Sequence, residues 1–314
     1  MKYCELEILS LQNISAKRIP CVVTIGMYDG VHIGHQQMLR ELSTVAKELN
    51  TKSIVITFTN HPRQVLDKKN DNPLFLLQTI DERFDKISRF SIDYIIPITF
   101  TKEFAHLTPK QFLDNLSQQL DIKVLLLGYD NRFGNPNNNE YEDLLEKGYY
   151  KDIKVKKDLS GVYFEDIEVS STQIRKAISS GEIKRANAML GNPYSLTSKV
   201  VKGLQNGNKL GFPTANILPT NDKIIPYSGV YATKTIIDGS IYNSITNIGD
   251  NPTFDAHDLT IETYIIDFNR DIYDKEITIQ FIDYIRQDKK FESIEDLKSQ
   301  MNKDLQDAKR ILCI

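Results

Sequence analysis

Two histidines three residues apart, His32 and His35, follow a short apolar run in the sequence. Residues 21–26 are apolar and rich in β-branched side chains, which is typical of a buried parallel strand. Over residues 35–49 the apolar side chains recur at helical spacing, so we expect the histidines at a helix N-terminus. There they lie on one face, beside unpaired backbone N–H groups and the positive end of the helix dipole. Such a place suits an anion, above all a phosphate.

This arrangement fits nucleotidyl transfer, in which a phosphate attacks the α-phosphorus of a nucleoside triphosphate and pyrophosphate leaves. Positioning and charge stabilisation carry the rate of such a reaction, and two imidazole donors can hold the α- and β-phosphate oxygens. Gly34 leaves room for a ligand to approach the backbone. The alternatives are a pair that caps the helix and a pair that binds a metal. For zinc a third ligand is needed, and only His61 lies near in sequence.

Composition limits the class of protein. The 314 residues predict two domains, and 40% hydrophobic with 26% charged residues is typical of a soluble globular protein. A net charge of −3 speaks against a nucleic-acid partner, and no apolar run approaches the length of a membrane span. The three cysteines are scattered and no signal-peptide pattern begins the chain, so we expect a cytoplasmic protein without disulfides.

The first half of the chain alternates strands with helices. After residues 21–26, apolar runs recur at residues 53–58, 94–98 and 124–128, and helical patterns cover residues 81–90 and 109–120. This order predicts a doubly wound, Rossmann-like α/β domain with a parallel sheet. Ligands of such sheets bind outside the carboxyl ends of the strands.

Polar segments follow those strand ends. Residues 59–63 come after the second strand, residues 128–134 after the fourth, and residues 170–175 open a later helix. Ser170 or Ser171 can cap that helix, with Arg175 about one turn in. Hydroxyls, helix N–H groups and a guanidinium that face one way make a triphosphate clamp. Singly, each segment could be an ordinary turn, loop or cap; their common order favours one ligand site.

The motifs at residues 24–36 and 170–175 resemble those of the adenylyltransferase half of the prokaryotic bifunctional riboflavin kinase/FAD synthetases, over residues 20–190. The resemblance implies catalytic roles for His32 and His35. It implies nucleotide binding by Gly26, Tyr28, Gly34, Asp130, Ser171, Thr172 and Arg175. It implies flavin binding by His61, Pro62, Arg63, Asn131 and Phe133. The chain departs from the family at Met27-Tyr28, where Asn-Phe is usual, and at Asn131, where Phe is usual; the second change predicts weaker flavin binding.

A different module follows Gly191. A hairpin with an Asp238-Gly239 turn joins residues 231–237 to 241–248. Further strands are expected at 260–268 and 277–285, and a terminal helix at 293–312. This pattern predicts a small antiparallel β-barrel with a C-terminal helix. We therefore place the domains at residues 1–188 and 189–314.

A glycine-rich segment of the second module has the chemistry of a phosphate loop. In this segment, residues 203–216, the glycines make a flexible loop whose backbone N–H groups could wrap phosphates, although no Walker motif is present. Thr214 and Asn216 supply hard oxygen atoms suited to Mg²⁺ bound to ATP. The alternative is an ordinary glycine-rich hairpin loop.

The octapeptide Leu-Gly-Phe-Pro-Thr-Ala-Asn-Ile, residues 210–217, is similar to the hallmark of riboflavin kinases. That resemblance implies a general-base role for Glu262, which would take the proton of the ribityl 5′-hydroxyl. It also implies nucleotide binding by Gly203, Gly207, Lys209 and Gly211, and flavin binding by Arg286 and Phe291. The chain has Asn208 and Asn251 where the family has Arg, and Asp288 where Glu is usual. The two lost cations predict a weaker kinase.

Together these features predict a bifunctional cytosolic enzyme. It would phosphorylate riboflavin to FMN and adenylylate FMN to FAD, with ATP and Mg²⁺. Its partners would be flavins and ATP alone, without nucleic acid or membrane, and it would be a monomer or weak homo-oligomer. The alternatives are an FMN adenylyltransferase with a degenerate kinase barrel and a non-catalytic flavin-binding regulator. The His32/His35 pair speaks against the regulator.

Overall fold

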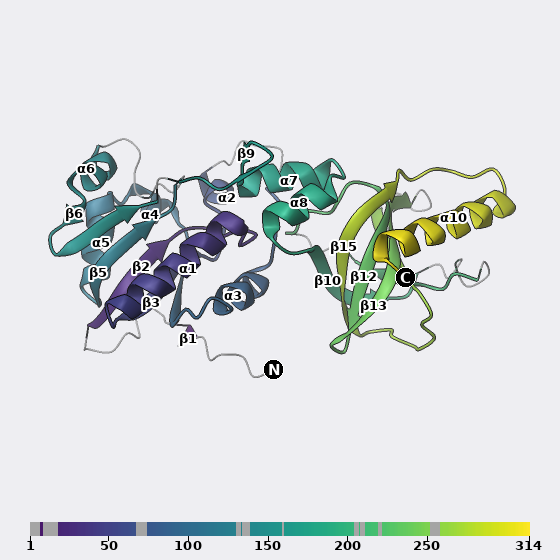
Figure 1. Cartoon of the computed structure of the whole chain (residues 1–314), viewed down its shortest axis with the longest axis horizontal. Coiled ribbons are helices and arrows are strands. Elements are labelled where there is room, and N and C mark those ends of the chain that lie inside the picture. Colours follow the sequence, from purple (N-terminus) through teal and green to yellow (C-terminus); the bar gives the residue numbers. More distant parts are fainter. Residues whose placement is uncertain are drawn as a thin grey trace. The chain divides into compact units, whose positions relative to one another are not determined.

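The computed structural model describes residues 7–8, 18–66, 74–129, 133, 139–158, 160–203, 207, 211–218, 222–251 and 258–314. The chain divides into two compact units, Met1–Val169 and Ser170–Ile314 (Figure 1). Helices α7 (Ser171–Ser179) and α8 (Ile183–Leu190) belong to the second unit. The domain boundary after residue 188 therefore stays a prediction, because the two helices that precede it are grouped with the barrel.

The first unit contains a seven-stranded sheet of order β1-β4-β3-β2-β5-β7-β6. Its strands are β1 (Glu7–Ile8), β2 (Ile19–Ile25), β3 (Lys52–Phe58), β4 (Tyr94–Ile98), β5 (Leu120–Leu127), β6 (Tyr149–Tyr150) and β7 (Ile153–Lys157). All neighbours pair in parallel except β6 and β7. The order turns back between β2 and β5, which is the switch point where such sheets bind ligands. The predicted doubly wound sheet is thus confirmed.

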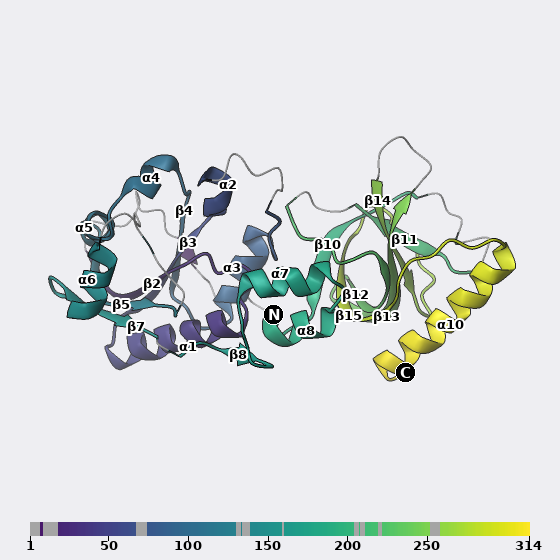
Figure 2. The same ribbon diagram turned by 90° about the horizontal axis from the view of Figure 1, so that it is seen from above.

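Helices cover both faces of this sheet (Figure 2). Val22 packs with α1 (Ile33–Glu48) and α3 (Ile80–Ser88), whereas its neighbour Val23 packs with α5 (Pro109–Ser117) and α6 (Glu140–Lys147). Successive strand residues point to opposite faces, so a strand covered on both sides reads as a continuous apolar run. The remaining elements of this unit are short: α2 (Pro62–Leu66), α4 (Lys102–His106), β8 (Tyr163–Phe164) and β9 (Ile167–Glu168).

One strand begins earlier than its apolar run. The sequence predicts a strand from residue 124 and a helix up to residue 120, but α5 ends at Ser117 and β5 starts at Leu120. Leu120 and Ile122 are buried, and they alternate with Asp121 and Lys123. This first part of β5 has one polar face, so its period of two is hidden beside the fully apolar part.

The second unit is a closed barrel of order β10-β11-β14-β13-β12-β15. Its antiparallel strands are β10 (Tyr194–Val201), β11 (Thr214–Ile217), β12 (Gly229–Ile237), β13 (Ser240–Asn251), β14 (Asp258–Ile265) and β15 (Glu276–Arg286). The predicted hairpin is confirmed: Asp238 and Gly239 have φ of 49° and 79°, as a two-residue turn with two left-handed residues requires. Helix α10 (Ile294–Leu312) begins after Ser293 and packs on β12, β13 and β15 (Figure 1).

Hydroxyl groups fill part of the barrel interior. Hydrogen bonds join Thr235 to Ser244 (2.8 Å), Ser244 to Thr233 (2.8 Å), Thr233 to Thr246 (2.9 Å) and Thr246 to Thr263 (2.9 Å). All of these side chains are fully buried. Each hydroxyl has a partner, so this hydroxyl ladder avoids the cost of burying unpaired polar groups.

No helix in the part of the chain that the structure describes is long and apolar enough to cross a membrane.

Candidate active sites

The loop after β2 is held in an uncommon backbone conformation. Tyr28, Gly30 and Val31 have φ of 51°, 89° and 43°, and for the β-branched Val31 such a value is a clear outlier. Side chains from elsewhere fix the loop: Gln78 Nε2 donates to the Tyr28 carbonyl oxygen and Gln36 Nε2 to that of Val31, each at 3.0 Å. Strain that the surroundings maintain in this way clusters at functional sites.

His32 is the N-cap of α1, which begins at Ile33. Its Nδ1 accepts the backbone N–H of His35 at 3.3 Å, so the capping alternative applies to this histidine. Because Nδ1 is the acceptor, the proton of the neutral His32 ring is on Nε2. The two rings stack with centroids 3.6 Å apart, and a Cβ on Gly34 would lie 3.3 Å from the His32 ring. Glycine at position 34 therefore lets the two histidines stand this close.

Both imidazoles are held in the neutral form. Burial lowers the pKa of His32 from its ordinary 6.5 to about 4. The pKa of His35 lies well below the ordinary value because of burial, the neighbouring His32 and the positive charge of Arg83. His35 is partly accessible, but its Nδ1 atom is buried and has no hydrogen-bond partner among the described residues. The site thus offers an unpaired ring nitrogen and a helix N-terminus, while the histidines carry no charge near neutral pH.

Arg83 of α3 is the functional candidate that the sequence reasoning missed. It is fully buried, and its Nη1 donates to the Phe58 carbonyl oxygen at 2.6 Å. A signal existed in the helical period, since position 83 lies three residues after Ile80 and four before the buried Ile87. An arginine in that apolar stripe is a buried charge. Charged side chains are rarely buried without a partner, so this arginine is a candidate for a functional role.

The other predicted residues of the first unit have varied surroundings. Pro62 and Arg63 begin α2, and His61 directly precedes it, with its Nδ1 accepting the backbone N–H of Arg63 at 3.1 Å. Phe133 is 9% exposed, with ring centroids 5.7 Å from those of Phe112 and Tyr141, so most of its surface is in the core. Asp130 and Asn131 lie outside the described residues.

Tyr28 and the motif at residues 170–175 are ordered by local contacts. The Tyr28 hydroxyl bonds to Thr24 Oγ1 at 2.7 Å, and a Cβ on Gly26 would lie 3.0 Å from the Tyr28 ring. Ser170 is the N-cap of α7 and accepts the backbone N–H of Gln173 at 3.3 Å, as one of the two predicted caps requires. Ser171, Thr172 and Arg175 then occupy the first two turns of that helix.

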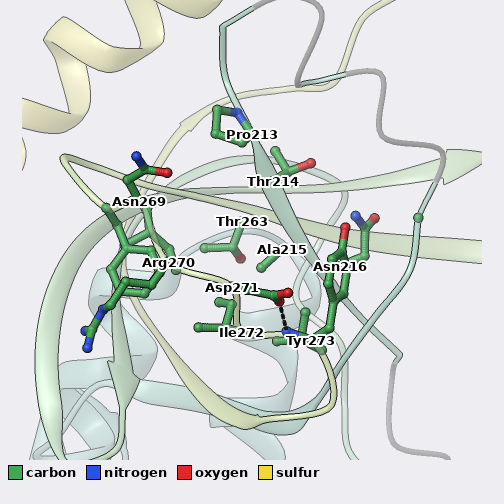
Figure 3. A pocket seen from close by; sticks show the side chains of 14 residues that line it. Pro213, Thr214, Ala215, Asn216, Thr263, Asn269, Arg270, Asp271, Ile272 and Tyr273 are labelled. Atoms are coloured by element: carbon green, nitrogen blue, oxygen red, sulfur yellow. Dashed lines mark hydrogen bonds between the residues drawn. The ribbon is translucent and has the colours of Figure 1, made fainter.

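Two cavities of about 270 Å³ each lie on the barrel, and Thr214 lines both. The first, the Asn216 cavity, is bounded by Asn216 on one side and by Asn269 and Arg270 on the other (Figure 3). The second, the Glu262 cavity, has aromatic walls from Phe212, Tyr264 and Phe291. Because Thr214 is common to the two, groups bound in the cavities would meet beside its hydroxyl.

A short polar chain marks that meeting point. Thr214 Oγ1 donates to Glu262 Oε2 at 3.2 Å. On the two strands that adjoin β14, Asn216 and Asn247 are the register partners of Glu262. Asn247 Oδ1 is buried and has no partner in the described parts of the chain. The predicted catalytic carboxylate and the two predicted metal ligands are therefore neighbours in the fold, although 46 positions separate Asn216 from Glu262 in sequence.

Arg286 reaches the Glu262 cavity but is engaged within the protein. Its Nε and Nη2 donate to the two carboxylate oxygens of Asp304 in α10, each at 2.8 Å. The guanidinium also lies 5.8 Å from the centroid of the Phe291 ring. Both predicted flavin residues, Arg286 and Phe291, thus line one cavity, and the Asp304 pair fastens α10 as one of its walls.

Close approach explains two glycines of the predicted phosphate loop. A Cβ on Gly203 would lie 2.5 Å from Asn216 Nδ2, and one on Gly207 would lie 2.2 Å from the Phe212 carbonyl oxygen. Gly211 has φ of 82° and open space around it. Asn208, Lys209 and the side chain of Asn251 lie outside the described residues. Within the described ranges, no group of three His, Cys, Asp or Glu side chains could hold a metal ion on its own.

Comparisons with known proteins agree with this division into two sites. The family model for FAD synthetase matches residues 14–173, and that for riboflavin kinase matches residues 190–312. A protein of Listeria monocytogenes is 34% identical over 92% of this chain and 91% of its own length. One of Bacillus subtilis is 33% identical over 95% of this chain and 94% of its own length. Each bears the name bifunctional riboflavin kinase/FMN adenylyltransferase.

A solved structure shares the architecture. It is titled as the crystal structure of a macrolide-efflux protein from Streptococcus pneumoniae, and it superposes with a TM-score of 0.86 at 29% identity. The likeness covers 95% of this chain and 97% of the other. The order of the two units therefore recurs in a solved protein.

Proposed function

We propose that this chain, which belongs to the family of bifunctional riboflavin kinase/FMN adenylyltransferases, is an enzyme with two activities. The first transfers the γ-phosphoryl group of ATP to riboflavin and gives FMN. The second transfers the adenylyl group of ATP to FMN and gives FAD and pyrophosphate. The observation that carries the proposal is that each family match covers a region with its own polar site: the histidine pair in one, the Thr214–Glu262 pair in the other.

For the kinase reaction, we place the nucleotide in the Asn216 cavity and the flavin in the Glu262 cavity. Aromatic walls suit a flat isoalloxazine ring, which favours Phe212, Tyr264 and Phe291 as its neighbours. The polar Asn216 cavity suits a nucleotide with its phosphates toward Thr214. The two substrates would then face each other at the one residue that both cavities share.

Glu262 is the proposed general base of this reaction. The ribityl 5′-oxygen attacks the γ-phosphorus, the bond from that phosphorus to the β–γ bridging oxygen breaks, and the hydroxyl proton passes to the Glu262 carboxylate. Thr214 orients this carboxylate through its hydrogen bond. In the substrate complex the Thr214 hydroxyl is placed to turn toward the phosphates, which releases one Glu262 oxygen for the proton.

Thr214 and Asn216 are the residues that would hold Mg²⁺. Their hydroxyl and amide oxygens are hard ligands, and a Mg²⁺ site built from few protein oxygens plus substrate phosphates is the usual form in phosphoryl-transfer enzymes. When bound, the ion neutralises charge on the β- and γ-phosphates. The donor set fits, because both oxygens belong to residues that line the cavity proposed for the nucleotide.

For adenylyl transfer, we place the triphosphate at the His32/His35 pair. A phosphate oxygen of FMN attacks the α-phosphorus, and the bond from the α-phosphorus to the α–β bridging oxygen breaks as pyrophosphate leaves. The His32 cap leaves an Nε2–H donor, and the N-terminal N–H groups of α1 supply further donors. Ser171, Thr172 and Arg175 stay proposed nucleotide-binding residues, as the family resemblance implies. The enzyme would work in the cytosol as a monomer or weak homo-oligomer.

Two assays on the purified chain test the proposal. Riboflavin, ATP and Mg²⁺ should give FMN, and FMN, ATP and Mg²⁺ should give FAD and pyrophosphate, both followed by chromatography. The variant His32→Ala/His35→Ala should lose FAD synthesis and keep FMN synthesis, whereas His106→Ala, at an exposed histidine of α4, should keep both. FAD synthesis without FMN synthesis would favour the degenerate barrel, and the absence of both would favour a flavin-binding regulator. Normal FAD synthesis by the double variant would refute the assignment of the histidines.

A further inference from the structure

Arg83 is a buried cation whose hydrogen-bonding capacity is mostly unused. Its Nη1 donates to the Phe58 carbonyl oxygen at 2.6 Å and lies 3.4 Å from Thr57 Oγ1. Its Nε and Nη2 are buried and have no partner among the described residues. An arginine of a stable core normally has its whole fork of donors satisfied.

The charge of Arg83 is also not matched by an ion pair. Asp29 lies near enough to influence the guanidinium, but the two form no salt bridge in the described ranges. The Asp29 carboxylate instead accepts the backbone N–H of Leu77 at 3.0 and 3.2 Å. Asp29 therefore compensates the charge of Arg83 only in part, and a buried charge without a close ion-pair partner lowers stability unless an anion from outside the chain binds nearby.

Arg83 lies directly behind the loop that precedes the histidine pair. The Thr57 hydroxyl that contacts Arg83 donates to the Met27 carbonyl oxygen at 3.1 Å, within the strained loop. The charge of Arg83 acts on His35, whose buried Nδ1 is likewise without a partner in the described residues. Both α1 and α3 thus carry a buried nitrogen without a hydrogen-bond partner among the described residues, and the two side chains are near enough for the charge of one to act on the other. Since the histidines are neutral, Arg83 supplies positive charge there.

We propose that Arg83 is a positioning residue of the adenylyl-transfer site, where its only partly compensated charge draws the substrate phosphates to the N-terminus of α1. It acts through the low-dielectric interior and through the Thr57–Met27 contact, without touching the reacting atoms. The apo fold would be stable in spite of this charge, and the bound polyphosphate would compensate it. This inference rests on the proposed function of the histidine pair.

Three variants separate charge from shape. Arg83→Lys and Arg83→Gln can both donate to the Phe58 carbonyl oxygen, and only the first keeps the charge. Arg89→Gln is the matched control, because Arg89 caps the same helix but is exposed and pairs with Asp85. The measurements are the KM for ATP in FAD synthesis, the KM for ATP in FMN synthesis by the same chain, and the Kd for inorganic pyrophosphate by calorimetry.

We expect Arg83→Gln to raise the KM for ATP in FAD synthesis, and the Kd for pyrophosphate, on the order of 10-fold or more above Arg83→Lys. FMN synthesis should be unchanged, since its site is in the other unit, and Arg89→Gln should behave as wild type. The free energy of opening of the first unit, measured by hydrogen exchange on the ligand-free Gln variant, should not fall below that of wild type.

Three results would overturn the inference. One is equal ATP and pyrophosphate affinity in the Lys and Gln variants. Another is an Arg83→Gln protein whose first unit does not fold, as judged by unprotected hydrogen exchange in β2 and β3, because the arginine would then serve structure. The third is a loss of ATP and pyrophosphate affinity in Arg89→Gln as large as that in Arg83→Gln. If wild type makes no FAD, the proposed function fails by itself, and the pyrophosphate Kd still decides whether Arg83 serves an anion.

Discussion

Acidification from pH 7 to pH 5 should destabilise the first unit because the buried His32 and the partly buried His35 are held as neutral rings. We expect the effect to be smaller in His32→Asn, in which the asparagine still supplies an oxygen that caps α1 but cannot take up a proton. The exposed His106 offers the control substitution, His106→Asn, which should leave the pH response as in wild type.

The size of the effect follows from the shifted pKa. His32 titrates near pH 4 in the folded chain and near 6.5 when unfolded, so between these values the unfolded chain binds more protons. The stabilisation is therefore complete above pH 6.5 and is lost as the pH falls toward 4. Between pH 7 and pH 5 the protonation of His32 lowers the free energy of unfolding by about 2 kcal/mol. His35, whose pKa is lowered too, adds a loss of the same sign.

Hydrogen exchange is the suitable assay, because a chain of two compact units does not give one two-state melting curve. Peptides from the buried strands β2 and β3 report the free energy of opening of the first unit, after correction for the intrinsic effect of pH on exchange. Wild type should lose about 2 kcal/mol more than His32→Asn between pH 7 and pH 5. Parallel losses in the two proteins would refute the claim that burial keeps His32 neutral.

Other expected outcomes concern the barrel. Glu262→Gln should lower the kcat of FMN synthesis about 100-fold or more and leave riboflavin affinity unchanged in a fluorescence titration, whereas Glu276→Gln, at an exposed strand carboxylate, should do neither. Thr214→Val should raise the KM for ATP in FMN synthesis about 10-fold and spare FAD synthesis; an unchanged KM would contradict the shared-cavity arrangement. Asp304→Asn should leave Arg286 half-buried without its anion, cost about 3 kcal/mol, and speed hydrogen exchange in α10; unchanged exchange would show that the pair does not fasten the helix.

Periodicity and turn chemistry predicted most of the fold, because each signal is local. The continuous apolar runs of β2, β3 and β4 and the Asp238-Gly239 turn needed no knowledge of distant contacts. The start of β5 was missed since Leu120 to Lys123 alternate between core and solvent over four residues only. Four alternating residues are fewer than the stretch over which helical or strand periodicity is judged, so they are easily assigned to the preceding helix.

The candidate sites were predictable where a motif is contiguous and less so where contacts are tertiary. The His32/His35 spacing and the Pro-Thr-Ala-Asn segment are visible in the sequence. The engagement of Arg286 by Asp304 is not, because the partner is 18 residues away on another element. Arg83 was overlooked because a charged residue in an amphipathic helix normally faces water; only its place in the apolar stripe distinguishes it.

The hydroxyl ladder inside the barrel also bears on how the strands find their partners. Side chains alternate between the two faces of a strand, so a slip of one position in β12, β13 or β14 would turn these hydroxyls outward and bring other side chains in. It would also break hydrogen bonds that link Thr233 to both Ser244 and Thr246. Apolar contacts tolerate small displacements, whereas a buried hydroxyl that is displaced from its partner costs the free energy of an unpaired polar group. The ladder therefore favours the native strand register over registers that slip by one position. Thr233→Val should yield more misregistered or slowly folding chains than its small loss of polar contacts would suggest.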